Sequence, residues 1–312
     1  MKHTRFFLLI LSTTILMGSC QKDPLEEVSE GKWNKERNIL GITFNGQVGD
    51  AVIERVGDAA TISFKYNTAA GQDFSKISVQ DIEISYGATA SADSGTVLNF
   101  DNQYKSATVT VTSVAGKSLD WTITLIPFTE TLLGTWNITG LVVYGGTGQA
   151  YGGTTTAKMT DKSWCWDTAK GPAAEQDNTL TFTLTGVTDD GSTYGTVVNN
   201  AGNDGLYADF IYTLSDPDFN VNGFYRKIPK GAGSWLRNYS TGMVTFTFAD
   251  GSISTGLFAT GTENLMGTQT RTIPDHAFAF TLKGNDDWAN IYKDIDRFVS
   301  NPVRYWVDIT KQ

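Results

Sequence analysis

The stretch Thr179-Leu180-Thr181-Phe182-Thr183-Leu184 places an apolar side chain at every second position, with a threonine before each one. Because side chains alternate between the two faces of a β-strand, this pattern predicts a strand with one buried and one solvated face. The same alternation returns over residues 244–248 and over residues 278–282. Threonine on the outer face is typical of an antiparallel sheet with water on one side. The pattern therefore predicts an all-β domain for residues 134–312.

The apolar period changes near the C-terminus. Apolar residues at positions 288, 291, 292, 295, 298 and 299 fall on one face of an α-helix. Asp286 or Asp287 precedes this segment as a candidate N-cap, and Asn301-Pro302 marks its end. A final strand over residues 303–309 follows. The sequence thus predicts a single amphipathic helix between the last two strands.

The order of these elements has a counterpart in one known family. Gly134-Thr135-Trp136 stands at the head of the first strand, about eight further strands follow, and one late helix precedes the terminal strand. This order resembles that of lipocalins, and the resemblance implies a closed β-barrel whose floor Trp136 closes beneath Arg271 or Arg304. A jelly-roll β-sandwich is the alternative, because the glycine-rich stretch 146–178 is long for a simple up-and-down barrel.

Residues 39–128 show a second set of short strand patterns. About seven apolar-alternating runs, such as residues 121–125, are separated by Gly, Asn and Asp. Such spacing predicts an immunoglobulin-like (Ig-like) β-sandwich. Residues 129–133 form the expected domain boundary, because one strand ends at Phe128 and a new pattern begins at Gly134.

Part of this segment also resembles a known module. It contains Tyr86-Gly87-Ala88-Thr89, then Ser94-Gly95 and Phe100, then Thr108-Val109-Thr110-Val111-Thr112. These residues resemble the Ig-like modules at the N-termini of Bacteroidota surface lipoproteins. The resemblance implies that residues 39–128 act as a spacer and carry no binding site.

The N-terminus has the form of a bacterial leader. Lys2 and Arg5 supply positive charge, and the apolar run that ends at Met17 is too short to cross a bilayer. A glycine and a serine then stand directly before Cys20. Residues 1–19 are therefore predicted to be a signal peptide.

The residues around the cleavage site resemble the lipoprotein box of bacteria. The resemblance implies that Cys20 carries diacylglycerol and a further acyl chain such as palmitate, and several chains together anchor a protein stably. Residues 20–38 have no sustained period and are predicted to be a tether. Gln21-Lys22-Asp23 resembles the export signals of Bacteroidota lipoproteins. These resemblances imply an outer-membrane lipoprotein that faces the cell exterior.

The net charge and the small numbers of histidine and cysteine residues exclude several kinds of partner and site. The formal net charge of −9 argues against nucleic acid as a partner. His3 lies in the leader, so His276 is the only imidazole of the mature chain and multi-histidine metal sites are excluded. No metal and no cofactor is predicted. Because Cys20 is expected to carry lipid, Cys165 has no partner for an internal disulfide and is predicted to be a small buried residue.

Paired catalytic residues are not evident. A glycosidase needs two facing carboxylates, yet this part of the chain offers only Glu130, Glu175 and Glu263, and most aspartates fall in turn sequences. We therefore expect no enzyme. The run from Asp216 to Asn222 places oxygen side chains at alternate positions, which leaves calcium binding open, although Lys227 stands where an EF-hand has its bidentate Glu.

Aromatic side chains supply the candidate ligand-binding residues. Trp164 and Trp166 would project on the same side of an extended chain, about 6.5 to 7 Å apart, which suits stacking on a sugar. Asp167, Gln176, Asp177 and Asn178 lie close in sequence as polar partners. The candidate residues are Trp164 and Trp166, flanked by Tyr144 and Tyr151, and a second pair of Trp235 and Tyr239. The alternative for each tryptophan is a place in the core, because Trp is highly buried on average.

Two classes of function remain open. The first is a non-catalytic cell-surface lipoprotein that binds an oligosaccharide or polysaccharide, similar to the accessory proteins of polysaccharide-utilisation systems. The second is a lipocalin-like carrier of a small apolar molecule, which needs an apolar cavity inside the barrel. A glycan-active enzyme ranks behind both.

Overall fold

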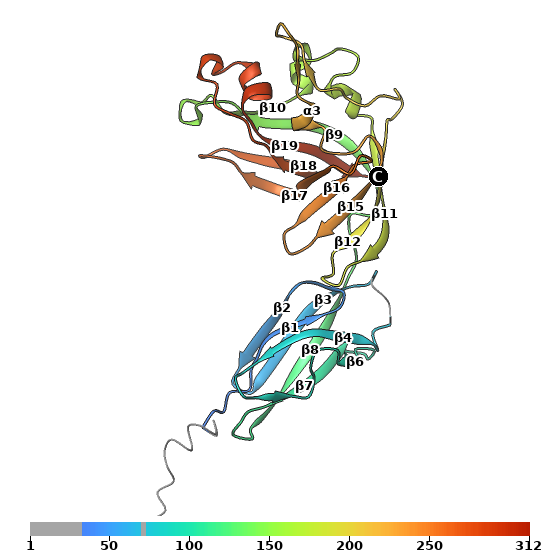
Figure 1. Cartoon of the computed structure of the whole chain (residues 1–312), viewed down its shortest axis with the longest axis vertical. Coiled ribbons are helices and arrows are strands. Elements are labelled where there is room, and N and C mark those ends of the chain that lie inside the picture. Colours follow the sequence, from blue (N-terminus) through green and yellow to red (C-terminus); the bar gives the residue numbers. More distant parts are fainter. Residues whose placement is uncertain (1–32, 70–72) are drawn as a thin grey trace, which may run out of the picture. The chain divides into compact units, whose positions relative to one another are not determined.

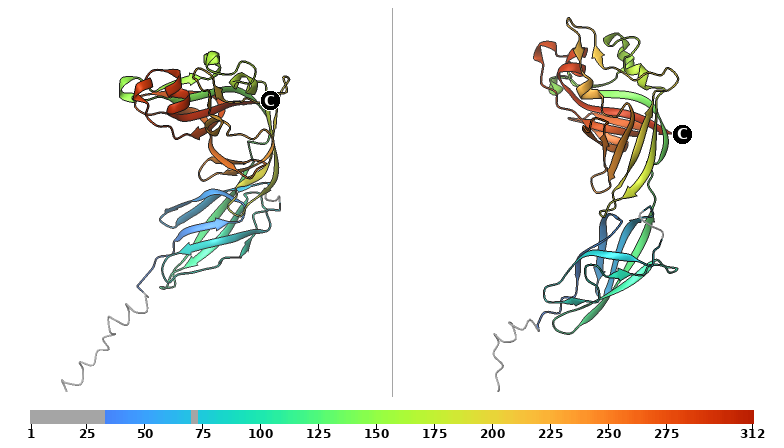
Figure 2. Two further views of the ribbon diagram at one scale, coloured as in Figure 1. Left: turned by 45° about the horizontal axis from the view of Figure 1, so that its top comes forward. Right: turned by 45° about the vertical axis from the view of Figure 1, so that its right-hand side comes forward.

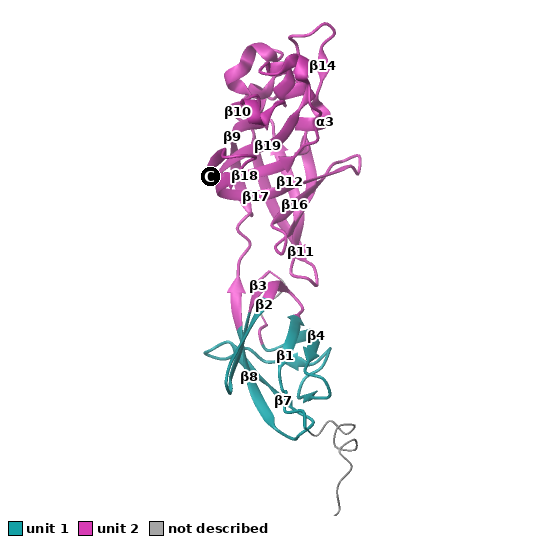
Figure 3. Cartoon of the chain, turned by 90° about the vertical axis from the view of Figure 1, so that its left-hand side faces the viewer, with its two compact units in different colours: residues 1–43, 51–63, 75–124 teal, residues 44–50, 64–74, 125–312 magenta. Residues whose placement is uncertain are grey.

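A computed structural model describes residues 33–69 and 73–312 of the chain. The predicted signal peptide, Cys20 and most of the tether lie outside the described residues. The described residues fall into two compact units, one formed by residues 33–43, 51–63 and 75–124 and the other by residues 44–50, 64–69, 73–74 and 125–312 (Figure 3). Within the described parts, no helix combines the length and the apolar character that a membrane crossing requires.

Residues 39–128 form a β-sandwich of two sheets (Figure 1). Its strands are β1 (Ile39–Phe44), β2 (Gln47–Val56), β3 (Ala59–Asn67), β4 (Ile77–Ile84), β5 (Thr89–Ala90), β6 (Val97–Leu98), β7 (Ser106–Thr112) and β8 (Ser118–Phe128). One sheet has the order β2-β3-β8-β7-β5 and the other has the order β1-β4-β6. Strand β8 shows the predicted alternation, because Trp121, Ile123 and Leu125 are buried between exposed or half-buried neighbours.

Residues 134–311 build a closed barrel of eight antiparallel strands. Its strands are β9 (Gly134–Gly145), β11 (Thr179–Val187), β12 (Thr193–Asn200), β15 (Gly231–Asn238), β16 (Met243–Thr247), β17 (Ile253–Asn264), β18 (Thr270–Thr281) and β19 (Pro302–Lys311). Each strand pairs with the next along the chain, and β19 pairs with β9 to close the circle. The predicted all-β fold is confirmed. The up-and-down order excludes the jelly-roll alternative, in which sequence neighbours switch between two sheets.

The remaining elements lie in the connections between barrel strands. Strand β10 pairs with the second half of β9, and β13 pairs with β14 in a small separate ladder. These elements are η1 (Gln149–Tyr151), β10 (Thr155–Lys158), η2 (Thr160–Cys165), η3 (Pro172–Glu175), β13 (Ile211–Tyr212), β14 (Phe219–Asn220), α3 (Asn222–Tyr225), η4 (Trp288–Asn290) and η5 (Asp296–Ser300).

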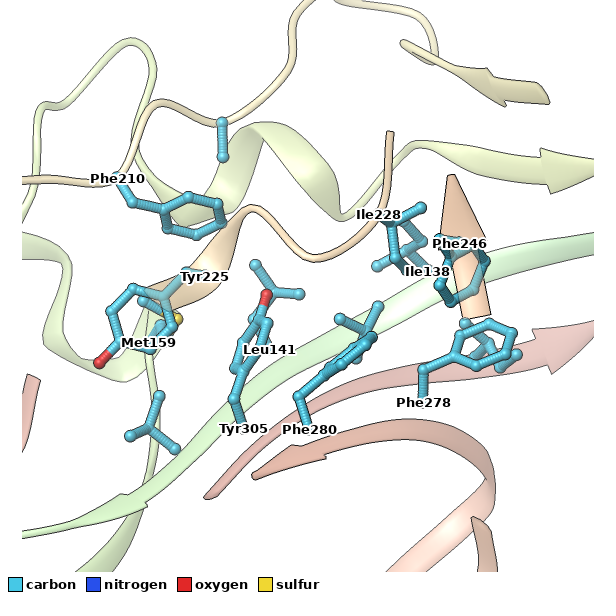
Figure 4. Packing of buried hydrophobic residues seen from close by; sticks show 14 of the residues in the cluster. Ile138, Leu141, Met159, Phe210, Tyr225, Ile228, Phe246, Phe278, Phe280 and Tyr305 are labelled. Carbon is cyan, nitrogen blue, oxygen red and sulfur yellow. The ribbon is translucent and has the colours of Figure 1, made fainter. Parts of the chain in front are cut away.

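Aromatic rings fill the interior of the barrel. Phe246 lies 5.0 Å from Phe278 and 6.3 Å from Phe182, measured between ring centroids, and all three side chains are buried. Figure 4 shows this packing continuing through Phe280 and Tyr305. An eight-stranded barrel is just wide enough for side chains to fill. The interior therefore offers no support for the carrier alternative, which needs an apolar cavity at this place.

The predicted helix over residues 288–299 is not continuous, because α- and π-helical backbone before the last strand covers only residues 294–300. The segment contains a turn of 3-10 helix, η4, and a short π-helix, η5. Between them Tyr292 has a φ of 72°, a left-handed conformation that an α-helix cannot contain. The break turns Trp288 and Tyr292 to the surface, while Phe298 remains in the core.

The predicted arginine over Trp136 is wrong. The cation above the Trp136 ring is Lys311, whose Nζ lies 5.3 Å from the ring centroid and which pairs with Trp136 across β9 and β19. Arg271 instead covers the ring of Trp306, at 4.6 Å, and Arg304 forms an ion pair with Glu263. Both arginines lie on the outer face of the barrel, whereas Trp136 belongs to the inner core.

Candidate functional site

Three long connections meet at one end of the barrel. Successive strands run in opposite directions, so residues 146–178, 201–230 and 282–301 all leave from the same end, which we call the loop end. Figures 1 and 2 show the short helices gathered there. The other end carries short turns, such as residues 188–192 and 239–242. Long connections on a rigid barrel are where binding residues concentrate.

The three connections share one aromatic cluster. The Trp166 ring lies 5.3 Å from Phe298, 6.0 Å from Tyr212 and 6.3 Å from Tyr225, measured between ring centroids. Figure 4 shows Tyr225 and Phe210 continuing the packed interior at this end. The barrel is thus closed at its loop end, and candidate binding residues lie on the outside of this cap.

Trp164 and Trp166 do not project on the same side. Trp164 belongs to η2, and in a 3-10 helix residues two apart point in different directions. As a result Trp164 is 56% exposed, whereas Trp166 is only 3% exposed. The predicted pair of stacking tryptophans is therefore corrected to one exposed ring above one core ring.

Both tryptophans nevertheless line the same surface pocket. The pocket has a volume of about 210 Å³ and lies between η2 and η3. Gly171 and Pro172 line it beside the two rings, and the Nζ of Lys162 lies 5.0 Å from the centroid of Trp164. A pocket with one exposed indole wall fits a sugar ring, which offers a flat C–H face to an aromatic surface.

Polar groups surround this pocket. Thr160, Ser163 and Thr168 contribute hydroxyl groups, and Asp167 contributes a carboxylate. The Oδ1 of Asp167 accepts hydrogen bonds from two backbone N–H groups, which fixes the carboxylate at the rim. Sugar hydroxyls both donate and accept hydrogen bonds, so this set can hold them in either role.

The other predicted polar partners lie elsewhere. Asp177 accepts backbone hydrogen bonds from Asn203 and Asp204. Asn178 is buried and donates to Glu175. Gln176 is not among the residues that line the pocket. Of the four partners predicted from proximity in sequence, only Asp167 lines it.

Two further candidates are core residues. Tyr144 is 1% exposed and packs with Trp306 on the outer face of the barrel, beneath the hairpin of β17 and β18. Trp235 is 2% exposed in the interior, where its Nε1 donates to the carbonyls of Thr183 and Thr196. Each ring is covered by protein, so neither is a surface for stacking. The alternative of a core position is the correct one for both.

Tyr239 has a structural partner at the opposite end of the barrel. Its hydroxyl donates to Glu130, which also accepts from Thr193 and forms an ion pair with Arg237 at 2.6 Å. Burial and the hydrogen bond to the carboxylate raise the pKa of Tyr239. Tyr239 thus helps to hold a buried carboxylate. It lies in the turn between β15 and β16, at the end of the barrel opposite to the loop end.

Tyr151 belongs to an exposed aromatic group that includes two residues not predicted as site residues. Tyr151, Trp288 and Tyr292 are 69%, 56% and 61% exposed, and we call them the aromatic triad. Tyr151 meets Trp288 edge to face at 6.1 Å, and the Tyr292 hydroxyl donates to the Tyr151 carbonyl at 3.0 Å. The triad forms a second exposed aromatic surface at the loop end.

A buried carboxylate ties together the two segments that carry the triad. Asp296 is 1% exposed and accepts hydrogen bonds from the backbone N–H and the hydroxyl of Thr147, at 2.6 and 2.8 Å. The Thr147 hydroxyl in turn accepts from the Asp287 N–H. Gly148 allows Trp288 to approach, because its φ is +74° and a Cβ there would lie 3.2 Å from the indole.

We expect Asp296→Ala to lower the free energy of unfolding by about 2 to 3 kcal/mol, because two hydrogen bonds to a buried carboxylate are lost. Thermal unfolding measures the loss, and hydrogen exchange over residues 146–153 should rise with it. Thr147→Val is the comparison variant and should cost about 1 to 2 kcal/mol, because the hydroxyl's bonds to Asp296 and from the Asp287 N–H are lost while the backbone bond to Asp296 remains. An unchanged melting temperature in Asp296→Ala would contradict this role.

The three glutamates considered for catalysis are engaged in ion pairs. Glu175 pairs with Arg226 at 2.6 Å and accepts from the Ala208 N–H, and Glu263 pairs with Arg304 at 2.7 Å. Burial by itself raises the pKa of Glu130, but the Arg237 charge and the hydrogen bonds to the carboxylate lower it overall. A glycosidase acid needs the opposite environment, one that raises its pKa.

Within residues 33–69 and 73–312, no group of three or more His, Cys, Asp and Glu could hold a metal ion. In the run from Asp216 to Asn222, where the sequence leaves calcium binding open, the side-chain oxygens of Asn220 and Asn222 accept hydrogen bonds from the backbone N–H groups of Asn222 and Phe210. The first bond is local to the run, and the second ties the run to the residue that precedes β13. Cys165 is buried as predicted. Its burial, and to a smaller extent the nearby Asp294 carboxylate, raises the pKa of its thiol to about 12.

No known protein family matches the chain, and no curated protein matches it. Among solved structures, a "putative secreted protein" of Bacteroides fragilis is similar with a TM-score of 0.23 and 14% identity, over 30% of this chain and 96% of that one. A "putative glycoside hydrolase" of Bacteroides thetaiotaomicron is similar with a TM-score of 0.25 and 12% identity, over 89% of this chain and 84% of that one. With TM-scores this low, the function has to be argued from the residues of this chain.

Proposed function

We propose that this protein is a non-catalytic, glycan-binding lipoprotein of the outer membrane that faces the cell exterior. The observation that carries the proposal is the pocket of about 210 Å³ beside the exposed Trp164. An apolar ring with hydroxyls and a carboxylate at its rim matches the mixed surface of a sugar. The aromatic triad adds a second surface for stacking on the same end of the barrel.

The proposal that the protein lacks catalysis rests on the carboxylates. Hydrolysis of a glycosidic bond requires an acid and a second carboxylate on opposite sides of the sugar. Asp167 is the only carboxylate among the residues that line the Trp164 pocket. We therefore expect binding without turnover.

The proposal is tested by probing an array of polysaccharides with the full chain in detergent, with the release of reducing ends measured in parallel. We expect weak binding to at least one glycan and no release of reducing ends. Release of reducing ends that stops on Asp167→Asn would contradict the non-catalytic assignment. Absence of binding across neutral and acidic polysaccharides would contradict the proposed function.

The membrane anchor is tested at the residue that the sequence points to. We expect Cys20→Ala to release the protein from the membrane fraction or to stall removal of its leader, because the thiol that would carry the lipid is lost. Cell fractionation and detergent partitioning measure the change. Cys165→Ala is the control and should stay in the membrane fraction, because Cys165 is buried. Unchanged partitioning of Cys20→Ala would contradict lipidation.

A further inference from the structure

A second and larger groove lies beside the Trp164 pocket at the loop end. Its volume is about 650 Å³, and the segments 212–215 and 290–297 form most of its walls. Lys162 closes one side of it. Its polar and charged lining includes Lys162, Asn290, Tyr292, Lys293, Asp294 and Arg297, and we call this space the basic groove.

The charges that line the basic groove do not balance. Asp294 is its only carboxylate, and it already pairs with both Lys162 at 3.3 Å and Arg297 at 2.9 Å. Lys293 is exposed, and its Nζ donates to the amide oxygen of Asn290 at 3.0 Å. Three cations thus line the groove together with one carboxylate, in a chain whose formal net charge is −9.

The basic groove connects the two aromatic surfaces of the loop end. Lys162 contributes to the groove and also lies 5.0 Å from the ring of Trp164. On the other side Tyr292 lines the groove and belongs to the aromatic triad. A glycan chain that stacks on either aromatic surface therefore brings its neighbouring sugar unit next to unbalanced positive charge.

We propose that the basic groove binds acidic sugar units, so that the ligand of this protein is a glycan that carries carboxylate or sulfate groups. This inference rests on the glycan-binding function proposed above. Ammonium and guanidinium groups donate strong hydrogen bonds to such anions, and a sugar acid leaves its ring face free to stack. Because the chain as a whole is acidic, a polyanion is attracted at this groove and repelled by most of the remaining surface.

Matched polymers test the charge directly. The full chain in detergent is titrated with polygalacturonate and its methyl ester, and with dextran sulfate and unmodified dextran. We expect at least one acidic polymer to bind about tenfold more tightly than its neutral form, and this preference should disappear in about 1 M salt, where the screening length falls to about 3 Å. The arm with the larger preference identifies carboxylate or sulfate as the recognised group.

Point variants locate the effect. Lys293→Gln should weaken binding of the acidic polymer about threefold to tenfold and leave binding of its neutral form and the melting temperature unchanged. Lys162→Gln should add to this loss. The matched control is Lys283→Gln, an exposed lysine of the same connection that does not line the groove. It should bind like the parent protein.

The outcomes separate this inference from the proposed function. If neutral and acidic forms bind equally, or if Lys283→Gln weakens binding as much as Lys293→Gln, the basic groove is not the recognition site and this inference fails. The proposed glycan-binding function would then still stand on the bound neutral polymer. If no polysaccharide binds at all, the proposed function fails, and this inference fails with it.

Discussion

Replacing Glu130 with Gln should lower the free energy of unfolding by about 3 to 5 kcal/mol, the loss typical of a buried ion pair that is left with one partner. Glu130 is buried, and its carboxylate pairs with Arg237 at 2.6 Å. It also accepts from the Leu132 N–H, the Thr193 hydroxyl and the Tyr239 hydroxyl. The variant leaves the half-buried Arg237 guanidinium without its carboxylate partner and turns one acceptor oxygen into a donor. Urea denaturation of the full chain measures the loss.

The same cluster gives the stability a pH dependence. Burial by itself raises the pKa of Glu130, but the Arg237 charge and the hydrogen bonds to the carboxylate outweigh it, so the pKa is lowered overall. Since the folded-state pKa lies below the unfolded value of about 4.3, the carboxylate stabilises the fold above that pH. This contribution is lost as the pH falls through the folded-state pKa. Glu130→Gln should therefore show a flatter stability profile in acid.

Two controls separate the buried pair from a general loss of charge. Glu263→Gln makes the same change at a partly exposed pair with Arg304 and should cost about 1 kcal/mol or less. The double variant Glu130→Gln/Arg237→Leu removes the unpaired charge and should recover part of the loss. A change below about 1 kcal/mol for Glu130→Gln would contradict the assigned role of this pair.

Trp166→Ala should destabilise the protein by about 3 to 5 kcal/mol, because it opens a cavity where three connections meet. Trp166 contacts Tyr212 and Tyr225 from one connection and Phe298 from another. Thermal unfolding should show a large drop in melting temperature. The cap should also become more accessible to hydrogen exchange, since each connection loses the ring that it shares with the others.

Two variants serve as controls for Trp166→Ala. Trp164→Ala removes the same kind of ring two residues away, from a side chain that is 56% exposed, and should leave the melting temperature almost unchanged. Trp166→Phe keeps an aromatic ring in the cluster and removes an indole N–H that has no acceptor among the described residues. It should lose much less than Trp166→Ala. Equal melting temperatures for Trp164→Ala and Trp166→Ala would contradict the core position of Trp166.

Local alternation predicted the barrel strands β11, β16, β18 and β19. Leu180 and Phe182 are buried while the threonines between them are not, because β11 packs one face inward as its period requires. The partner of Trp136 could not be predicted in the same way. Its pairing with Lys311 depends on closure between β9 and β19, the first and last strands of the barrel. That register is set by the whole circle and not by any single stretch of sequence.

The candidate site was only partly predictable. Trp164 was chosen because the N-terminus resembles surface-targeting signals and because this tryptophan stands in a polar, glycine-rich stretch. Its pairing with Trp166 assumed an extended chain, whereas η2 forms there. Trp288 and Tyr292 fit a helical period, and nothing in the sequence marks Tyr292 for a left-handed conformation, which non-glycine residues rarely adopt. The tie between Asp296 and Thr147, which holds this segment in place, joins residues 149 positions apart. Such long-range contacts leave no local pattern.

We propose the exposed ring of Trp164 as the place where a glycan binds. Calorimetric titration of the full chain and of Trp164→Ala with the polysaccharide that binds most tightly, beside thermal melts of both, tests this proposal most directly. We predict that Trp164→Ala loses about 1 to 3 kcal/mol of binding free energy, as expected for an aromatic hot spot, at an almost unchanged melting temperature. Unchanged affinity in a variant that remains fully folded would contradict the claim.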